Sequence, residues 1–312
     1  MSRVVNGVAS VDQNIRQAVE RAISSTGYQP NLAARSLVTR RANAIVLVLP
    51  KDNQVLGDPF FGRVVTGVMS VLAPTNVHLV LVKLGPGTRD RVIADLRGGR
   101  LDGAIIVHTD QNDPLPGRLI GDRLPVVLWG PPPRPMSINY VDVNQSAGAA
   151  LAARHLVALG RKRIATITGP LDTPAGKDRL AGFRAAMSEL GHHDVAWTEG
   201  TFSRESGTTA MERLIADHPD LDGVFVASDL MAQGAVPVLR RLGRRIPDDV
   251  AIVGFDDSSA ALNCDPPLTT VRQPVEDMTA ELARQLLRQI DNPATPITTV
   301  IFEPTLVVRE SA

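Results

Sequence analysis

The sequence predicts an α/β protein in which a small helical segment precedes two domains built on parallel sheets. Throughout residues 43–312, short apolar runs typical of buried strands alternate with helix patterns, an order that produces parallel sheets with right-handed crossovers. The alternation restarts near residue 147, which indicates a second domain of similar design. The length of 312 residues and the hydrophobic fraction of 44% are sufficient for two compact cores.

Residues 12–25 have the pattern of one short amphipathic helix. Asp12 is a suitable N-cap, and Ile15, Val19 and Ile23 recur at the spacing of one helix face. A helical unit that ends at Leu37 is too short to fold alone, so we expect it to need a partner or further sequence.

The next segment favours a second, marginal helix. Gly27 suits the position after a helix end, Pro30 prevents the first helix from continuing, and Asn31 can cap a new one. A helix of about two turns is shorter than the ~12–15 residues that an isolated helix needs in water. It would form only when packed, which makes the segment a candidate switch; an ordinary interdomain linker is the alternative.

Charge is distributed unevenly along a chain whose net charge is zero. Residues 1–41 contain six arginines and two acidic residues, so this segment carries +4 and favours a polyanionic partner. No run of ~18 apolar residues is present, so we expect no membrane partner. The N-terminus lacks the apolar segment of a secretory signal, which favours a cytoplasmic protein. The single cysteine, Cys264, excludes an internal disulfide and a cysteine-rich metal site.

The body divides into two series of predicted elements. In the first series, strands are expected at residues 44–49, 78–82, 104–107 and 126–129, with a helix that opens at residues 58–61. In the second, strands are expected at residues 163–167, 224–227, 250–254 and 300–308. Its helices are expected at residues 147–159, 175–190, 231–242 and 276–290. Ligands of such open sheets bind beyond the carboxyl ends of the strands.

Polar and aromatic side chains follow these predicted strand ends, a mixture that suits a polyhydroxylated ligand such as a sugar. They are Lys51, Asp52, Phe60, Asp172, Arg179, Phe202, Ser228, Asp229 and Asp256. The alternatives are that Asp229 and Asp257 only cap helices and that Phe60 is a core residue.

No constellation in the sequence favours an enzyme. No Gly-x-Gly-x-x-Gly, phosphate-binding Gly-Lys-Ser/Thr or Gly-x-Ser-x-Gly motif is present. His192 and His193 have no third ligand at a metal-binding spacing and are expected to face solvent. We therefore expect no catalytic residues, no metal and no cofactor.

Several motifs together closely resemble those of the lactose-repressor (LacI/GalR-type) family of bacterial transcriptional regulators. The resemblance extends from residue 2 to about residue 308, and the set is specific because the motifs occur in the family's order. They lie at residues 2–7, 27–31, 34–37, 58–61, 155–165, 179–183, 228–232, 253–257 and 267–274.

The resemblance implies a fold in three parts. A partial helix-turn-helix headpiece would cover residues 1–27, a hinge helix and linker residues 28–42, and a periplasmic-binding-protein-like body residues 43–312. The body would have two Rossmann-like subdomains with an effector cleft between them. The first would comprise residues 43–140 and 272–298, and the second residues 141–271 and 299–312.

The resemblance also implies the partners and the residues that contact them. Two chains would form a homodimer, or a tetramer, and their hinge helices would pair in the minor groove of double-stranded operator DNA, with Leu37 wedged between base steps. The implied DNA-binding residues are Ser2, Arg3, Asn6, Tyr28, Asn31, Ala34 and Leu37. Against the family pattern, Met1 falls inside the recognition helix, and the residues that reach base edges would precede it.

The implied effector-binding residues are Phe60, Arg179, Phe202, Ser228, Asp256 and Gln273. Ser228 stands where many family members carry asparagine, so one hydrogen bond to the effector is expected to differ. The resulting hypothesis is a cytoplasmic, nucleoid-associated repressor whose operator affinity changes when a small effector, a sugar, binds. The alternative is a cytoplasmic sugar-binding sensor that has lost specific DNA binding through N-terminal truncation.

Overall fold

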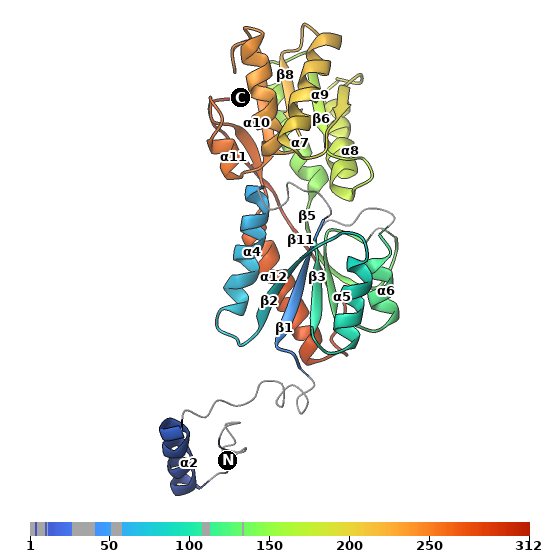
Figure 1. Cartoon of the computed structure of the whole chain (residues 1–312). Helices are drawn as coiled ribbons and strands as arrows, with labels where there is room; N and C mark the ends of the chain where they lie inside the picture. Colours follow the sequence, from blue (N-terminus) through green and yellow to red (C-terminus); the bar gives the residue numbers. More distant parts are fainter. Residues whose placement is uncertain are drawn as a thin grey trace.

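The computed structural model describes residues 4, 10, 12–26, 41–50, 58–107, 113–132 and 134–312. Its body consists of two α/β lobes, one above the other in Figure 1, with a separate N-terminal helix. Within these described ranges, no helix is long and apolar enough to cross a membrane.

The N-terminal helix α2 (Gln13–Thr26) begins where the sequence predicts. The Asp12 carboxylate accepts hydrogen bonds from the backbone N–H groups of Asn14, at 2.9 Å, and Ile15, at 3.3 Å. Asp12 is therefore the N-cap. None of the side chains of this helix is buried, and Ile15 is 56% exposed, so its apolar face is uncovered in the single chain.

Lobe 1 is built on a fully parallel six-stranded sheet in the order β11-β5-β4-β3-β1-β2. Its strands are β1 (Ala44–Leu49), β2 (His78–Lys83), β3 (Gly103–Ile106), β4 (Val126–Trp129), β5 (Asn139–Val143) and β11 (Thr299–Phe302). Alternate side chains of β1 point to opposite faces of the sheet. Ile45 and Leu47 pack with α4 (Pro59–Leu72) and α12 (Val275–Asp291). Val46 and Val48 pack with α5 (Thr88–Arg97) and α6 (Leu115–Gly121).

Lobe 2 repeats the design with the sheet order β12-β10-β9-β8-β6-β7. Its strands are β6 (Ile164–Thr168), β7 (Ala196–Glu199), β8 (Gly223–Val226), β9 (Ala251–Asp256), β10 (Thr269–Arg272) and β12 (Thr305–Val307). Only β12 among these is antiparallel to its neighbour. One face is covered by α7 (Gln145–Ala158) and α8 (Pro174–Glu189). The other is covered by α9 (Arg204–Asp217) and α10 (Asp229–Arg241), with the short α11 (Ser259–Leu262) beside α10.

The strand pairing corrects two of the boundaries that the sequence predicts between the lobes. Residues 299–302 form β11, which pairs with β5 in lobe 1, so they do not belong to the second lobe. The whole of β5 pairs with lobe 1 as well, which moves the first crossing from residue 140 to Asn144. The other crossings lie between β10 and α12 and between β11 and β12. β11 and β12 have similar apolar content in the sequence, and only their hydrogen-bond partners assign them to different sheets.

Candidate functional site: a pocket between the lobes

A pocket of about 260 Å³ lies between the two lobes, at the carboxyl ends of strands from both sheets. Lobe 1 contributes Asp58, Phe60, Phe61, Trp129 and Asp142 to its lining, among others. Lobe 2 and the crossings contribute Gln145, Arg179, Phe202, Ser228, Asp256 and Gln273. All six predicted effector residues therefore line one pocket.

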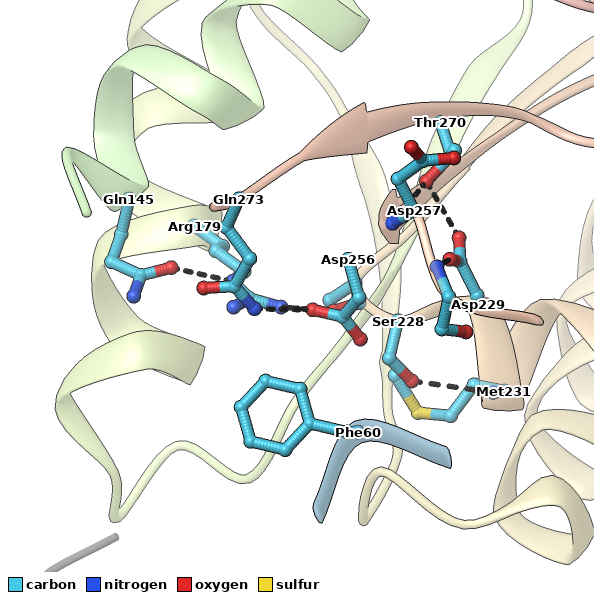
Figure 2. A network of polar contacts seen from close by, with 12 residues as sticks. Phe60, Gln145, Arg179, Ser228, Asp229, Met231, Asp256, Asp257, Thr270 and Gln273 are labelled. Carbon is cyan, nitrogen blue, oxygen red and sulfur yellow. Dashed lines mark hydrogen bonds and ion pairs between the residues drawn. The ribbon is translucent and has the colours of Figure 1, made fainter. Parts of the chain in front are cut away.

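Arg179, on α8, brings a guanidinium group to the floor of the pocket. Its Nε donates to Gln145 Oε1 at 2.8 Å, and its NH1 donates to the carbonyl oxygen of Ala227 at 2.5 Å. The same group lies 3.6 Å from the Asp256 carboxylate and 3.6 Å above the ring centroid of Phe255. Figure 2 shows Arg179 between Gln145 and Asp256. These contacts fix the orientation of the planar donor groups.

Asp256, at the end of β9, lies beside Arg179 in the pocket lining. Its carboxylate accepts a hydrogen bond from Gln273 Nε2 at 2.7 Å. Burial, opposed by the charge of Arg179, raises the pKa of Asp256 to about 7. The buried Gln273 Oε1 has no hydrogen-bond partner among the described residues. The pair therefore offers a bound molecule both an acceptor and a carboxyl group that can exchange a proton near neutral pH.

Aromatic rings from both lobes form the apolar part of the pocket. In lobe 1, the Phe60 ring lies edge-on to those of Phe61, at 5.4 Å, and Trp129, at 5.3 Å. Phe202 approaches from lobe 2, where its ring lies so close to Gly169 that a Cβ there would be 2.1 Å from it. Pyranose rings have apolar faces that stack on such surfaces, whereas their hydroxyl groups need the polar floor.

Ser228 has a structural as well as a pocket-lining role. Its hydroxyl oxygen accepts a hydrogen bond from Met231 N at 3.2 Å and so caps α10 (Figure 2). The predicted alternative that Asp229 is a cap is wrong. Asp229 is fully buried and accepts hydrogen bonds from Ser258 N, at 2.7 Å, and Thr270 Oγ1, at 2.6 Å. Burial raises the pKa of the Asp229 carboxyl well above its usual range.

The alternative that Asp257 is a helix cap is wrong too. Its carboxylate is bound by Arg272 at 2.6 Å and by Arg309 at 2.5 Å. Ser258 caps the following helix α11 instead. Burial acts to raise the pKa of Asp257, but the hydrogen bonds from Arg309 and Arg272 and their charges together outweigh burial and lower this pKa. Asp257 does not line the effector pocket.

Sequence reasoning missed two polar residues of the pocket floor, Asp142 and Gln145. The Asp142 carboxylate accepts hydrogen bonds from Gln145 Nε2 and from Val143 N, both at 2.8 Å. Burial raises the pKa of Asp142 to about 6. The strand-end rule would have found Asp142 and Trp129, because they lie at or near the ends of β5 and β4. β5 was missed because polar residues interrupt its apolar pattern.

Other predicted residues lie elsewhere or outside the described ranges. Asp172 is exposed and does not line the pocket. Of the two histidines expected to face solvent, His193 is exposed and His192 is half-buried. Within the described ranges, no cluster of histidine, cysteine and acidic residues could hold a metal ion. The residues that lie outside these ranges are Lys51, Asp52 and the predicted DNA contacts Ser2, Arg3, Asn6, Tyr28, Asn31, Ala34 and Leu37.

Comparison with known proteins gives this two-lobed arrangement a family. Residues 153–312 match the periplasmic binding protein-like domain. The whole chain aligns with the HTH-type transcriptional regulator CelR of Thermobifida fusca at 41% identity, covering 93% of that protein. The chain belongs to the LacI family of transcriptional regulators.

Solved structures of LacI-family proteins have the same fold. The complex of CelR with cellobiose superimposes with a TM-score of 0.83 at 38% identity, covering 100% of this chain and 94% of that one. A lac repressor dimer bound to operator and an anti-inducer superimposes with a TM-score of 0.86 at 25% identity, covering 99% of this chain and 93% of that one. These relatives are transcriptional regulators and not enzymes.

Proposed function

We propose that this LacI-family chain is a DNA-binding transcriptional repressor whose operator affinity is changed by a sugar bound between its lobes. The observation that carries the proposal is the pocket itself. It gathers Phe60, Arg179, Phe202, Asp256 and Gln273 from both lobes into one polar floor with aromatic walls. A ligand that touches both lobes binds one relative orientation more tightly than another, and this difference is the coupling free energy that regulation requires.

The proposed effector is a glucose disaccharide such as cellobiose. CelR, whose structure is solved as a complex with cellobiose, is 38% identical to this chain in the structural alignment. Arg179, Asp256 and Gln273 would bind the hydroxyl groups of one sugar ring at the polar floor. The aromatic side chains of Phe60 and Phe202 would stack on apolar ring faces. Ser228, whose hydroxyl already caps α10, retains a free donor hydrogen for one further contact.

The proposed output is a homodimer on operator DNA, in the cytoplasm. The lac repressor with the same fold is a dimer bound to its operator. In this chain the hinge helix would pair with that of the partner in the minor groove and insert Leu37, which kinks the duplex. Rotation of the lobes on sugar binding would then shift the hinge between ordered and disordered states.

Binding of the protein to DNA from upstream of its own gene tests the proposal. Two chains are compared, this one and one extended to the next upstream in-frame start, with and without cellobiose. We expect specific binding with steep salt dependence, lowered by cellobiose, and weaker binding by the Leu37→Ala variant. Cellobiose binding without specific DNA binding by either chain would instead establish the sugar sensor.

A further inference from the structure

Arg63, near the start of α4, uses all five of its N–H donors beside the pocket. Nε and NH2 donate to the two carboxylate oxygens of Glu276, each at 2.7 Å. NH1 donates to the backbone carbonyl oxygens of Asp256, at 2.8 Å, and Asp257, at 3.3 Å. NH2 also donates to the carbonyl oxygen of Gln273 at 3.3 Å. The guanidinium group is thereby saturated and held in one orientation.

These acceptors belong to different lobes. Arg63 and Glu276 lie on α4 and α12, which pack together in lobe 1. Asp256 ends β9 in lobe 2, and Gln273 lies in the crossing between β10 and α12. The Glu276 carboxylate therefore fixes the arginine on lobe 1, and the remaining donors reach lobe 2. A rotation of one lobe against the other must lengthen or break the bonds to Asp256 and Asp257.

The backbone that Arg63 holds is in an unfavourable conformation. Asp256 has φ 110° and Asp257 has φ 50°, so two consecutive non-glycine residues adopt positive φ values. Such conformations persist only where the surroundings determine them. The Asp256 side chain projects into the pocket from this turn, and its position depends on the carbonyl group that Arg63 binds.

We propose that Arg63 is a positioning residue, which ties lobe 1 to the Asp256–Asp257 turn and so holds the Asp256 carboxylate in the effector pocket. Arg63 does not line the pocket, so it acts through Asp256. The charge of Arg63 also reaches Asp256, where it opposes the rise in the pKa of that carboxyl. The inference rests on the proposed function only in taking the pocket as the sugar site.

The tie between the lobes is tested first without any ligand. Nitroxide labels are placed at Ala94→Cys on α5 and Ala185→Cys on α8, two exposed positions on different lobes. The natural Cys264 is buried, and burial raises the pKa of its thiol to about 12, so the reagent labels the introduced cysteines. With labelled chain diluted in unlabelled chain, we expect one narrow distance distribution, which Arg63→Met broadens or shifts. An unchanged distribution in Arg63→Met would overturn the tie.

The positioning of Asp256 is tested by cellobiose titration calorimetry on Arg63→Met, Asp256→Ala and the double variant. We expect Arg63→Met to weaken binding about tenfold to a hundredfold, the range for hydrogen bonds from a charged group. In the Asp256→Ala background, the same change should have almost no effect, because no carboxylate remains to be positioned. Equal losses in both backgrounds would show a general structural effect and overturn the proposal.

Arg245→Met is the matched control. Arg245 makes a comparable two-bond pair with Asp249, at 3.0 and 2.7 Å, but entirely within lobe 2. Its loss should leave both the label distances and the cellobiose affinity unchanged. If the unmodified chain binds no cellobiose, the proposed effector is wrong, and the ligand-free distances still decide whether Arg63 ties the lobes.

Discussion

At the scale of single residues, three buried carboxylates surround the Arg179 guanidinium, and two of them, Asp142 and Asp256, line the pocket. Asp142, Asp229 and Asp256 all lie close enough to Arg179 to act on its charge. One cation cannot neutralise three buried anions, and burial accordingly raises the pKa of each acid. Carboxyl groups that keep a proton can donate as well as accept hydrogen bonds, which suits the hydroxyl groups of a sugar.

The Asp142→Asn variant tests this balance. The folded-state pKa of Asp142 is about 6, against 3.8 for the ordinary carboxyl, so its contribution to stability is fully present below pH 3.8 and lost as pH rises through 6. The asparagine side chain keeps the acceptor oxygen and has no charge to bury. Between pH 5 and pH 7.5, the free energy of unfolding of the native protein should fall relative to the variant by about 1 kcal/mol. Urea unfolding measures this difference. If the free energies of unfolding of the two proteins change equally with pH across this range, the raised pKa of Asp142 is contradicted.

The Arg179→Lys variant tests whether binding depends on the planar guanidinium group of Arg179, which donates two hydrogen bonds in fixed directions. Lysine keeps the charge but cannot reach both Gln145 Oε1 and the Ala227 carbonyl oxygen from a planar group. We expect a loss of cellobiose affinity of at least tenfold, or about 1.4 kcal/mol. Quenching of Trp129, in a background where the exposed Trp197 is replaced by phenylalanine, provides the measurement.

The matched control for Arg179→Lys is Arg184→Lys. Arg184 lies over the ring of Trp197 on the outer surface of lobe 2, away from the pocket. Its replacement should leave cellobiose affinity unchanged. Equal losses in the two variants would show a general effect of arginine replacement on α8, and the planar two-bond geometry of Arg179 would then not explain the loss.

The sequence identifies acids at strand ends but not which of them face the pocket. Asp229 and Asp256 both follow apolar runs, and Asp229 turns toward Thr270 and Ser258 while Asp256 turns toward Arg179. The partners of Asp229 are 29 and 41 residues away in the sequence, so only the tertiary fold brings them to it. Arg63 had no local signal at all, because its acceptors are 193–213 residues away in the sequence.

At the scale of elements, the close approach of α4 and α12 determines where Arg63 meets Glu276. Gly67 allows this approach, since a Cβ at that position would lie 2.0 Å from Thr279 Oγ1 and 2.3 Å from the Glu276 carbonyl oxygen. The backbone of α12 cannot yield without moving lobe 1. The glycine is therefore required by packing and not by its φ angle.

The Gly67→Ala variant should accordingly be destabilised by about 1–3 kcal/mol. Gly117→Ala is the control, because Gly117 lies within α6 and a Cβ there meets no atom within 4 Å. The free energy of unfolding of Gly117→Ala should rise by up to about 1 kcal/mol from helix propensity alone. Urea unfolding of both proteins measures the contrast. An unchanged free energy of unfolding in Gly67→Ala would show that α4 and α12 can move apart without cost.

The middle of α12 contains a buried side-chain amide that lowers the stability of the fold. Gln285 is buried, and neither polar atom of its side chain has a partner among the described residues. Gln285→Leu should raise the free energy of unfolding by about 1–3 kcal/mol, since an unpaired buried amide is removed. One turn later, Gln289 Oε1 accepts a hydrogen bond from Val126 N at 3.1 Å. Gln289→Leu removes this bond and should lower the free energy of unfolding by about 1 kcal/mol. Thermal denaturation measures both variants. A change in stability of the same sign in Gln285→Leu and Gln289→Leu would contradict this account.

Strands with uniform apolar content were predictable, whereas one edge strand and one mostly polar helix were not. β1 and β4 match their predicted spans because every residue is apolar and their strands are covered on both sides. β7, at the edge of its sheet, has alternating half-buried and exposed residues, and α9 has a mostly polar sequence. Both depend on tertiary neighbours more than on their own composition, and the sequence analysis missed both.

At the scale of the whole molecule, the chain crosses between the lobes three times, so neither lobe is a continuous segment. Lobe 1 needs β11 and α12 from the C-terminal part of the chain to complete its sheet and cover it. The pocket lies beside the crossings, where Asp142 precedes the first and Gln273 lies in the second. A ligand in the pocket therefore contacts both lobes and the segments that join them.

This connectivity predicts how the sugar changes stability. Cellobiose at a hundred times its dissociation constant should raise the free energy of unfolding by about 2.7 kcal/mol. If it binds both lobes, as Phe60 and Asp256 on opposite sides of the pocket require, the unfolding of both must shift together. Fluorescence of Trp129 reports on lobe 1 and that of Trp197 on lobe 2, so two single-tryptophan proteins separate the transitions. A shift confined to one of them would place the sugar on that lobe alone, and lobe rotation could then not be driven by its binding.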